Sequence, residues 1–373
     1  MLFSVQQRGQ HTLLSFGFYS MRLSSIALVG CAGVVAQASN DRPIIAIFAH
    51  PSSNTDPGCG GKCDYTAASY PKWIEAAGGR AVPVPYDASD EHVAALFRQT
   101  NGLLWPGGGA SLSAAAKNFY GRAVAANAAG DHYPIWGTCL GFEWLLQAAA
   151  NDTSVLQKGF DAENITLPLD FTPDGAQGRV FGSDAALISI LQREPVAMNN
   201  HMSGMEPATL AALPALSGFF DVLATNADRE GRRFVSMIEG KTQPIYGTQW
   251  VRLRAFARPR PFFSVCPFVC LRTRCSHEHY RPPHPARAPA RSQHPEKNMF
   301  EWGEYPDGSP YEVINHSADA VAVAQKLADF FVAEARKNDH KFDTPEAEQA
   351  ALYYNYSPSK TGPGFVQEYF FHW

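Results

Sequence analysis

The most informative stretch of this 373-residue chain is YPIWGTCLGFEWLL, at residues 133–146. A short apolar run leads into Gly-Thr-Cys-Leu-Gly, and a helical pattern follows at once. A cysteine between two glycines at a strand-to-helix turn is the thiol counterpart of a nucleophile elbow. The helix N-terminus behind Cys139 favours its thiolate. A lone cysteine is more often a small buried apolar residue, but the glycines and the position favour a nucleophile here.

Short apolar runs alternate with helical patterns on the amino-terminal side of this turn. Residues 44–49, 81–84 and 102–105 are typical of fully buried strands. Helices are predicted between them, one around Trp73 and one over residues 91–99. Strands that alternate with helices form right-handed crossovers and a parallel sheet. The sequence therefore predicts an α/β fold with a central, mostly parallel sheet, helices on both faces and chemistry at the carboxyl ends of the strands.

A glycine run follows the third of these strands, at residues 106–109. Glycines there allow backbone N–H groups to converge on a ligand without obstruction by side chains. A bare glycine run is more often just a turn, but its place beside the predicted elbow strengthens the functional interpretation. We predict that the N–H of Leu140, with that of Gly108 or Gly109, forms an oxyanion hole.

A thiolate nucleophile also needs a base, which is normally a histidine oriented by a third group. The sequence contains twelve histidines. His294-Pro295-Glu296 supplies the best candidate, because a histidine and a carboxylate two residues apart project to the same side of an extended segment. We therefore predict a Cys139, His294 and Glu296 constellation.

The overall composition is that of a globular chain with a balanced charge. It has 31 Lys and Arg against 35 Asp and Glu, a net charge of −4, and 45% hydrophobic residues. This balance excludes a global basic field for nucleic acid. The longest apolar run, residues 26–36, is shorter than the roughly 20 residues that a membrane span needs, so none is expected. Cys59 and Cys63 lie in a glycine-rich loop, and the sequence is compatible with either a local disulfide or two free thiols there.

The amino end has the three-part order of a secretory signal peptide. A start at Met21 precedes the apolar run, and Ala36-Gln37-Ala38 provides a cleavage signal. Residues 21–38 are then the signal peptide, and residues 1–20 are an upstream extension or a long first region of the same signal. We expect a secreted, lysosomal or vacuolar glycoprotein, in agreement with sequons at Asn151, Asn164, Asn315 and Asn355.

Taken together, these residues resemble the gamma-glutamyl hydrolases, which have a class I glutamine-amidotransferase-like fold. The resemblance covers roughly residues 43–250 and 294–342. It rests on Arg42-Pro43-Ile44-Ile45, Tyr65-Thr66-Ala67-Ala68-Ser69-Tyr70, Trp105-Pro106-Gly107-Gly108, Gly137-Thr138-Cys139-Leu140-Gly141-Phe142-Glu143, Leu167-Pro168-Leu169-Asp170-Phe171-Thr172, Tyr246-Gly247-Thr248-Gln249-Trp250, His294-Pro295-Glu296-Lys297 and Glu301-Trp302.

The resemblance implies a single domain over residues 39–373, built as a three-layer sandwich. It also implies a cysteine peptidase without cofactor or metal that hydrolyses the γ-linked glutamate chains of folates. Cys139 would attack the γ-carbonyl, His294 would protonate the departing amine, and Glu296 would orient His294. Water would then release the acyl-enzyme.

Three further residues acquire roles through the same resemblance. Glu143 would lie near the pocket and contact the substrate amine, against the alternative of a solvated residue in the first turn of a helix. His201 matches a pocket histidine of the family, against the alternative of a loop histidine. Tyr65 would line the entrance of the pocket, although an ordinary packed tyrosine fits the sequence nearly as well.

One segment departs from the family pattern. The family strand Tyr-Gly-x-Gln-Trp runs straight into His-Pro-Glu, whereas here residues 251–293 separate Trp250 from His294. This insertion of 43 residues contains nine Arg, seven Pro and three Cys, with Glu278 as its only acidic residue. Its Cys and His spacing fits no standard zinc module. Valine codons begin with GT, glutamine can be encoded by CAG, and the length keeps the reading frame, so we interpret the insertion as a translated intron.

The sequence leaves three functions open. The first is a γ-glutamyl peptidase acting on poly-γ-glutamyl folates. The second is a glutaminase-type amidotransferase domain, which a secretion signal disfavours because ammonia channelling needs a cytosolic synthetase. The third is an inactive chain, in which the insertion misplaces His294. The oligomeric state, including a homodimer, stays open.

Overall fold

The computed structural model describes most of the chain beyond the predicted signal peptide. The predicted upstream extension, the signal peptide and the insertion lie outside the described residues, as does His294. The assignments made for those segments therefore stay predictions. The described ranges are residues 40–52, 59–250, 296–362 and 365–373.

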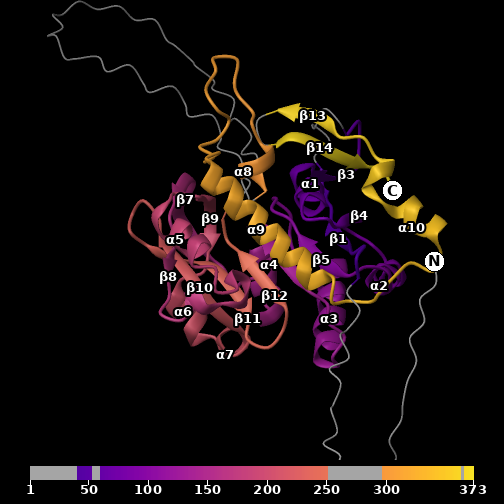
Figure 1. Ribbon diagram of the computed structural model, residues 1–373, viewed down its shortest axis with the longest axis horizontal. Coiled ribbons are helices and arrows are strands. Elements are labelled where there is room, and N and C mark those ends of the chain that lie inside the picture. Colours follow the sequence, from indigo (N-terminus) through magenta and orange to yellow (C-terminus); the bar gives the residue numbers. More distant parts are fainter. Residues whose placement is uncertain (1–39, 53–58, 251–295, 363–364) are drawn as a thin grey trace, which may run out of the picture. The chain divides into compact units, whose positions relative to one another are not determined.

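An eight-stranded sheet forms the centre of the described structure (Figure 1). The first five strands in its spatial order pair in parallel, and the remaining pairings are antiparallel. The order is β4 (Arg80–Val84), β1 (Ile44–Phe48), β5 (Gly102–Trp105), β6 (Ile135–Thr138), β12 (Ile245–Thr248), β11 (Arg233–Gly240), β10 (Phe220–Ala227) and β8 (Asp170–Phe171). The predicted buried strands are thus confirmed within a residue or two of their bounds.

Helices cover both faces of this sheet. On one face Trp136 of β6 packs against Trp73 and Phe331, at ring centroid distances of 5.7 Å and 5.9 Å. On the other face Trp105 of β5 packs against Tyr120 and Trp144. The helices are α1 (Ser69–Ala76), α2 (Asp90–Gln99), α3 (Ala114–Ala128), α4 (Leu140–Ala150), α5 (Ala185–Arg193), α6 (Pro207–Ala212), α7 (Pro214–Ser217), α8 (Lys297–Phe300), α9 (Ala318–Ala335) and α10 (Pro345–Ala351). The predicted α/β architecture is confirmed.

Local sequence signals explain several helix starts. The hydroxyl of Ser89 accepts a hydrogen bond from the backbone N–H of His92 and so caps α2. Ser317 caps α9 in the same way through Ala320. None of the described helices combines the length and the apolar character needed to cross a lipid bilayer.

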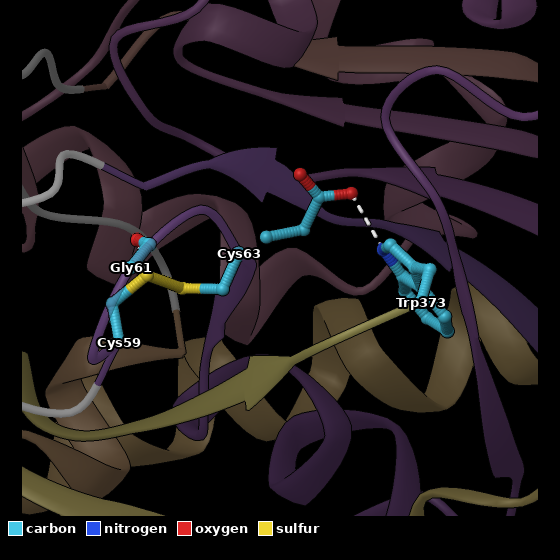
Figure 2. Close-up of a disulfide and its surroundings, with 5 residues drawn as sticks. Cys59, Gly61, Cys63 and Trp373 are labelled. Carbon is cyan, nitrogen blue, oxygen red and sulfur yellow. Dashed lines mark hydrogen bonds between the residues drawn. A yellow bond between two sulfur atoms is a disulfide. The ribbon is translucent and has the colours of Figure 1, made fainter.

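A smaller four-stranded sheet brings the carboxyl end of the chain back to its amino-terminal half. Its order is β13 (Ser359–Gly362), β14 (Phe365–Phe371), β3 (Asp64–Ala67) and β2 (His50–Pro51). Beyond β14, the indole Nε1 of Trp373 donates a hydrogen bond of 2.7 Å to a carboxylate oxygen of Asp64 (Figure 2). A third sheet pairs β7 (Gln157–Leu167) with β9 (Ala197–Gly204). The sequence reasoning had foreseen none of this carboxyl-terminal pairing.

Of the two states left open for Cys59 and Cys63, the structure has the disulfide. The bond closes a short loop just before β3 (Figure 2). Both cysteines are buried. The bridge thus directly precedes β3, the strand that pairs with β14 of the carboxyl-terminal hairpin.

Helix α4 approaches strand β5 very closely at Gly141. A Cβ on Gly141 would lie 2.0 Å from the carbonyl oxygen of Trp105, and one on Gly137 would lie 2.5 Å from the carbonyl oxygen of Gly141. Both obstacles are backbone atoms, which cannot rotate away as a side chain can. The two glycines of the predicted elbow are therefore required by close packing.

We predict that Gly141→Ala destabilises the protein by more than about 3 kcal/mol, because the methyl group overpacks a contact with rigid backbone. Gly121→Ala is the matched control. Gly121 lies inside α3 with open space around its Cα, so alanine should stabilise by about 0.5–1 kcal/mol. Urea unfolding of both variants measures the difference. Equal effects of the two substitutions would contradict the close approach at the elbow.

Candidate active site

Cys139 occupies a strained turn between β6 and α4. Its backbone has φ of 53° and ψ of −104°. This conformation is energetically unfavourable for any residue with a Cβ. The backbone N–H of Cys139 donates to the carbonyl of Thr248 on β12 at 2.7 Å, and its own carbonyl accepts from Glu143 at 2.9 Å. These bonds hold the strained conformation in place. The side chain is buried and is not part of a disulfide. The elbow predicted from the sequence is present.

Tyr70 links three parts of the candidate site, although the sequence reasoning assigned it no role. Its buried hydroxyl accepts a hydrogen bond of 2.6 Å from the backbone N–H of Gly107. The same hydroxyl hydrogen-bonds the carboxyl of Glu296 and lies near enough to Cys139 for the charge of its thiolate form to raise the pKa of Tyr70 further. Burial, and then the negative charge of Glu296, raise the pKa of Tyr70 well above its usual value. The phenol therefore stays neutral, able to accept from Gly107 and donate to Glu296.

Glu296 lies directly before α8 and is fully buried. Burial raises the pKa of its carboxyl well above the usual range, because the charged form loses its hydration. The ammonium of Lys297 and the hydroxyl of Tyr70 act in the opposite direction, and the carboxyl of Glu301 raises the pKa further. The structure thus brings Glu296 and Cys139 to the same tyrosine. His294 lies outside the described residues, so the predicted base is not placed.

The glycine run after β5 lies beside the elbow. In the parallel register Trp105 is opposite Gly137, so the segments that follow β5 and β6 begin side by side. Gly108 packs onto His50, where a Cβ would lie 2.6 Å from the imidazole, while Gly109 is exposed. The N–H of Gly107 is already used in its hydrogen bond to Tyr70. The N–H groups of Gly108, Gly109 and Leu140 therefore remain the predicted oxyanion donors.

His50 packs against this glycine run without adding charge. Its ring is buried, and Nε2 lies 3.4 Å from the carbonyl oxygen of Pro106. Burial lowers the pKa of His50 to about 4, against weaker raising effects of the backbone contacts. The imidazole is therefore neutral at mildly acidic and neutral pH.

The comparisons with known proteins agree with this geometry. The peptidase C26 family model matches residues 43–153, which include the elbow. The chain is 33% identical to gamma-glutamyl hydrolase of Bos taurus over 93% of this chain and 96% of the relative. It is 34% identical to that of Homo sapiens over 82% and 83% of the two chains, and 31% identical to gamma-glutamyl hydrolase B of Dictyostelium discoideum over 94% and 86%. This chain belongs to the gamma-glutamyl hydrolase family. It is a hydrolase of the cysteine peptidase type.

Glu143 is buried, so the alternative of a solvated residue in the first turn of a helix is wrong. Only 5% of its surface is exposed. Its Oε1 lies 3.5 Å from Nε2 of Gln249, which directly follows β12. The helical first turn was predicted correctly, but the neighbouring strand that covers it comes from a distant part of the chain. Contact of Glu143 with a substrate amine stays a prediction.

His201 and Tyr65 have well-packed surroundings. His201 lies in β9 and not in a loop, with Nδ1 2.9 Å from the carbonyl oxygen of Ser203 and its ring 4.5 Å from that of Phe234. The loop alternative for His201 is therefore wrong. Tyr65 lies in β3 opposite Phe370 of β14, as an ordinary packed tyrosine would. The pocket roles of both residues stay predictions.

We predict that Tyr70→Phe slows the alkylation of Cys139 by iodoacetamide several-fold at neutral pH. The variant removes the hydroxyl that donates to Glu296, so Glu296 is ionised less readily and supports the reactive thiol less well. Tyr133→Phe is the control, because Tyr133 is also buried and bonded, to Thr100 at 2.6 Å. Each variant should lose about 1–2 kcal/mol of stability. An unchanged alkylation rate in Tyr70→Phe would show that Tyr70 only fills space.

Proposed function

We propose that this chain hydrolyses the γ-glutamyl bonds of folate poly-γ-glutamates through a covalent thiol mechanism. The observation that carries the proposal is the strained Cys139 at the N-terminus of α4, near Tyr70, whose hydroxyl is hydrogen-bonded to the carboxyl of Glu296. A strained nucleophile with a buried carboxylate nearby is typical of acyl transfer. Membership in the gamma-glutamyl hydrolase family supports the choice of bond.

In the proposed mechanism, the thiolate of Cys139 attacks the γ-carbonyl carbon of the substrate. The backbone N–H groups of Leu140 and the glycine run stabilise the oxyanion. His294 protonates the departing amine, and the acyl-enzyme forms as the C–N bond breaks. His294 then takes a proton from water, which attacks the thioester and releases Cys139. Glu296 orients the imidazole, and Glu143 binds the amine of the γ-glutamyl unit.

We infer that residues 251–293 are a translated intron that weakens this activity. In the family pattern the strand that ends at Trp250 leads directly to the catalytic histidine. Strand β12 ends in buried, bonded surroundings, with the N–H of Gln249 donating to the carbonyl of Ser236 at 2.8 Å. A rigid strand end is suited to delivering a base accurately, and a misplacement of about 1 Å can cost about a hundredfold in rate.

We predict that joining Trp250 directly to His294 gives an active enzyme, whereas the full chain is weakly active or inactive. Both forms, each with and without Cys139→Ala, are assayed under mildly acidic conditions on a folate poly-γ-glutamate, a γ-glutamyl peptide and free glutamine. The Cys139→Ala forms should fold and lack hydrolysis.

Three outcomes of this assay would count against the proposals. A full chain at least as active as the joined form would overturn the intron interpretation. Hydrolysis that survives Cys139→Ala would overturn the thiol mechanism. A preference for free glutamine over both γ-glutamyl substrates would favour the amidotransferase alternative.

We also propose that the chain is targeted to the secretory pathway and that Asn151 is its main glycan acceptor. Asn151 is exposed at the carboxyl end of α4. By contrast, the side-chain amides of Asn315 and Asn355 donate to backbone carbonyls at 3.1 Å and 2.8 Å, and Asn164 accepts from the N–H of Val313. A glycan on these three sites would compete with bonds that hold the fold.

We predict high glycan occupancy at Asn151 and low occupancy at Asn315 and Asn355 when a secreting eukaryotic host expresses the chain. Enzymatic deglycosylation in heavy-oxygen water, followed by peptide mass mapping, measures each site. The same peptides from Asn151→Gln serve as the control. Glycans on Asn315 in a protein that lacks them on Asn151 would contradict the assignment, and a chain that retains Met1 without glycans would contradict the targeting.

A further inference from the structure

The backbone of the glycine run contains two hydrogen-bond donors that the fold does not use. Of the described residues, none accepts a hydrogen bond from the N–H of Gly108 or from that of Gly109. Gly108 is buried, and a buried backbone N–H without an acceptor is rare in folded proteins because it is costly. Such donors suit an oxyanion only if the run keeps one conformation, and glycines by themselves leave the backbone free to move.

Two side chains fix the ends of the run by hydrogen bonds. The hydroxyl of Tyr70 accepts from the N–H of Gly107. Trp144 of α4 donates from Nε1 to the carbonyl oxygen of Ala110, directly after the run, at 3.3 Å. Neither contact reaches Gly108, which lies between them.

His50 of β2 contacts the part of the run that these two bonds leave unsupported. Nε2 lies 3.4 Å from the carbonyl oxygen of Pro106, and a Cβ on Gly108 would lie 2.6 Å from the imidazole. Nδ1 is buried without a partner among the described residues, so the ring proton is assigned to Nε2, which has the carbonyl as acceptor. The rings of Tyr65 and Trp144 pack around the imidazole, at centroid distances of 5.9 Å and 5.3 Å. The imidazole is therefore itself held in place.

We propose that His50 is a positioning residue, which donates to Pro106 and packs on Gly108 and so fixes the glycine run in the conformation that an oxyanion beside Cys139 requires. The use of these N–H groups as an oxyanion hole rests on the proposed function, whereas the contacts of His50 do not. Because burial lowers the pKa of His50 to about 4, its imidazole is a neutral donor and adds no charge that would itself attract an oxyanion.

The test separates the reactivity of the thiol from the stabilisation of an oxyanion, and it uses the full chain. Glutaric semialdehyde adds reversibly to a thiol. Sγ of Cys139 bonds to the aldehyde carbon, the electron pair of the C=O bond moves to the oxygen, and the thiol proton ends on that oxygen. Alkylation by iodoacetamide places no oxygen in the hole. Protection of Cys139 from iodoacetamide therefore gives the dissociation constant of the aldehyde without any hydrolysis.

We expect His50→Leu to weaken aldehyde binding about tenfold or more and to leave the alkylation rate within about twofold. His50→Gln should stay within about threefold of the parent chain in both measurements, because its amide can still donate to the carbonyl of Pro106. His340→Leu is the matched control. Nδ1 of His340 lies 2.8 Å from the carbonyl oxygen of Phe97 and its ring packs on that of Phe97, so this variant removes an equivalent contact outside the glycine run. It should change neither measurement.

Weaker aldehyde binding in His50→Leu with recovery in His50→Gln supports the proposal, since general loosening would not depend on a donor at this position. Unchanged binding in His50→Leu, an equal loss in His50→Gln or His340→Leu, a parallel loss of alkylation, or no protection of the parent chain overturns it.

If His50→Leu does not fold, His50→Asn decides. Its amide is one methylene shorter and does not reach Pro106, so aldehyde binding equal to that of His50→Gln overturns the proposal. Absent γ-glutamyl hydrolysis together with aldehyde binding that depends on His50 would count against the proposed function alone.

Discussion

The close approach of helix α4 to strand β5 is the constraint on which the site depends. Gly141 lies against the carbonyl of Trp105 with no room for a Cβ. This contact keeps the N-terminal turn of α4 close to the end of β5. Cys139 then has to adopt a positive φ, because the chain must turn sharply from β6 into a helix that lies so near. The hydrogen bond from Cys139 to Thr248 of β12 supports that strained turn from the other side. Strain at the nucleophile is therefore a consequence of layer packing, which is maintained by the whole sheet.

Around this turn, the site is assembled from segments that are far apart in the sequence. Tyr70 comes from α1, Cys139 from the elbow and Glu296 from the residues before α8. The Tyr70 hydroxyl is hydrogen-bonded to Glu296 and lies close enough to Cys139 for a thiolate there to raise its pKa. The carboxyl-terminal hairpin completes the arrangement, since β14 pairs with β3 just before α1 and also contacts Lys297 and Glu301. A substitution in the hairpin can therefore affect the charge state of the site without touching a substrate.

Sequence reasoning succeeded where the signal was local. The elbow at Cys139, the cap at Ser89 and the buried strands are each specified by neighbouring residues, through glycine, hydroxyl or apolar patterns. It failed where burial depends on distant partners. For Glu143 the helical position alone leaves a solvated residue and a residue near the pocket both open, and only the contact with Gln249 after β12 shows that it is covered. Tyr70 belongs to a family motif, but nothing in the sequence indicates its role, which comes from Gly107 and Glu296, two residues that no spacing rule connects to it.

The same contrast explains how an insertion can spare a fold and still impair a site. A long connection between two fixed ends costs little closure entropy, about 0.6 kcal/mol for each doubling in length. Strand β12 keeps its parallel register with β6 up to Thr248, and Glu296 is buried and hydrogen-bonded to Tyr70, so the described residues on both sides of the insertion are packed into the fold. A catalytic imidazole has a narrower tolerance, because it must meet both a thiol and a carboxylate within hydrogen-bond reach. Folding averages over many weak contacts, whereas this geometry depends on where the chain between Trp250 and Glu296 places a single imidazole.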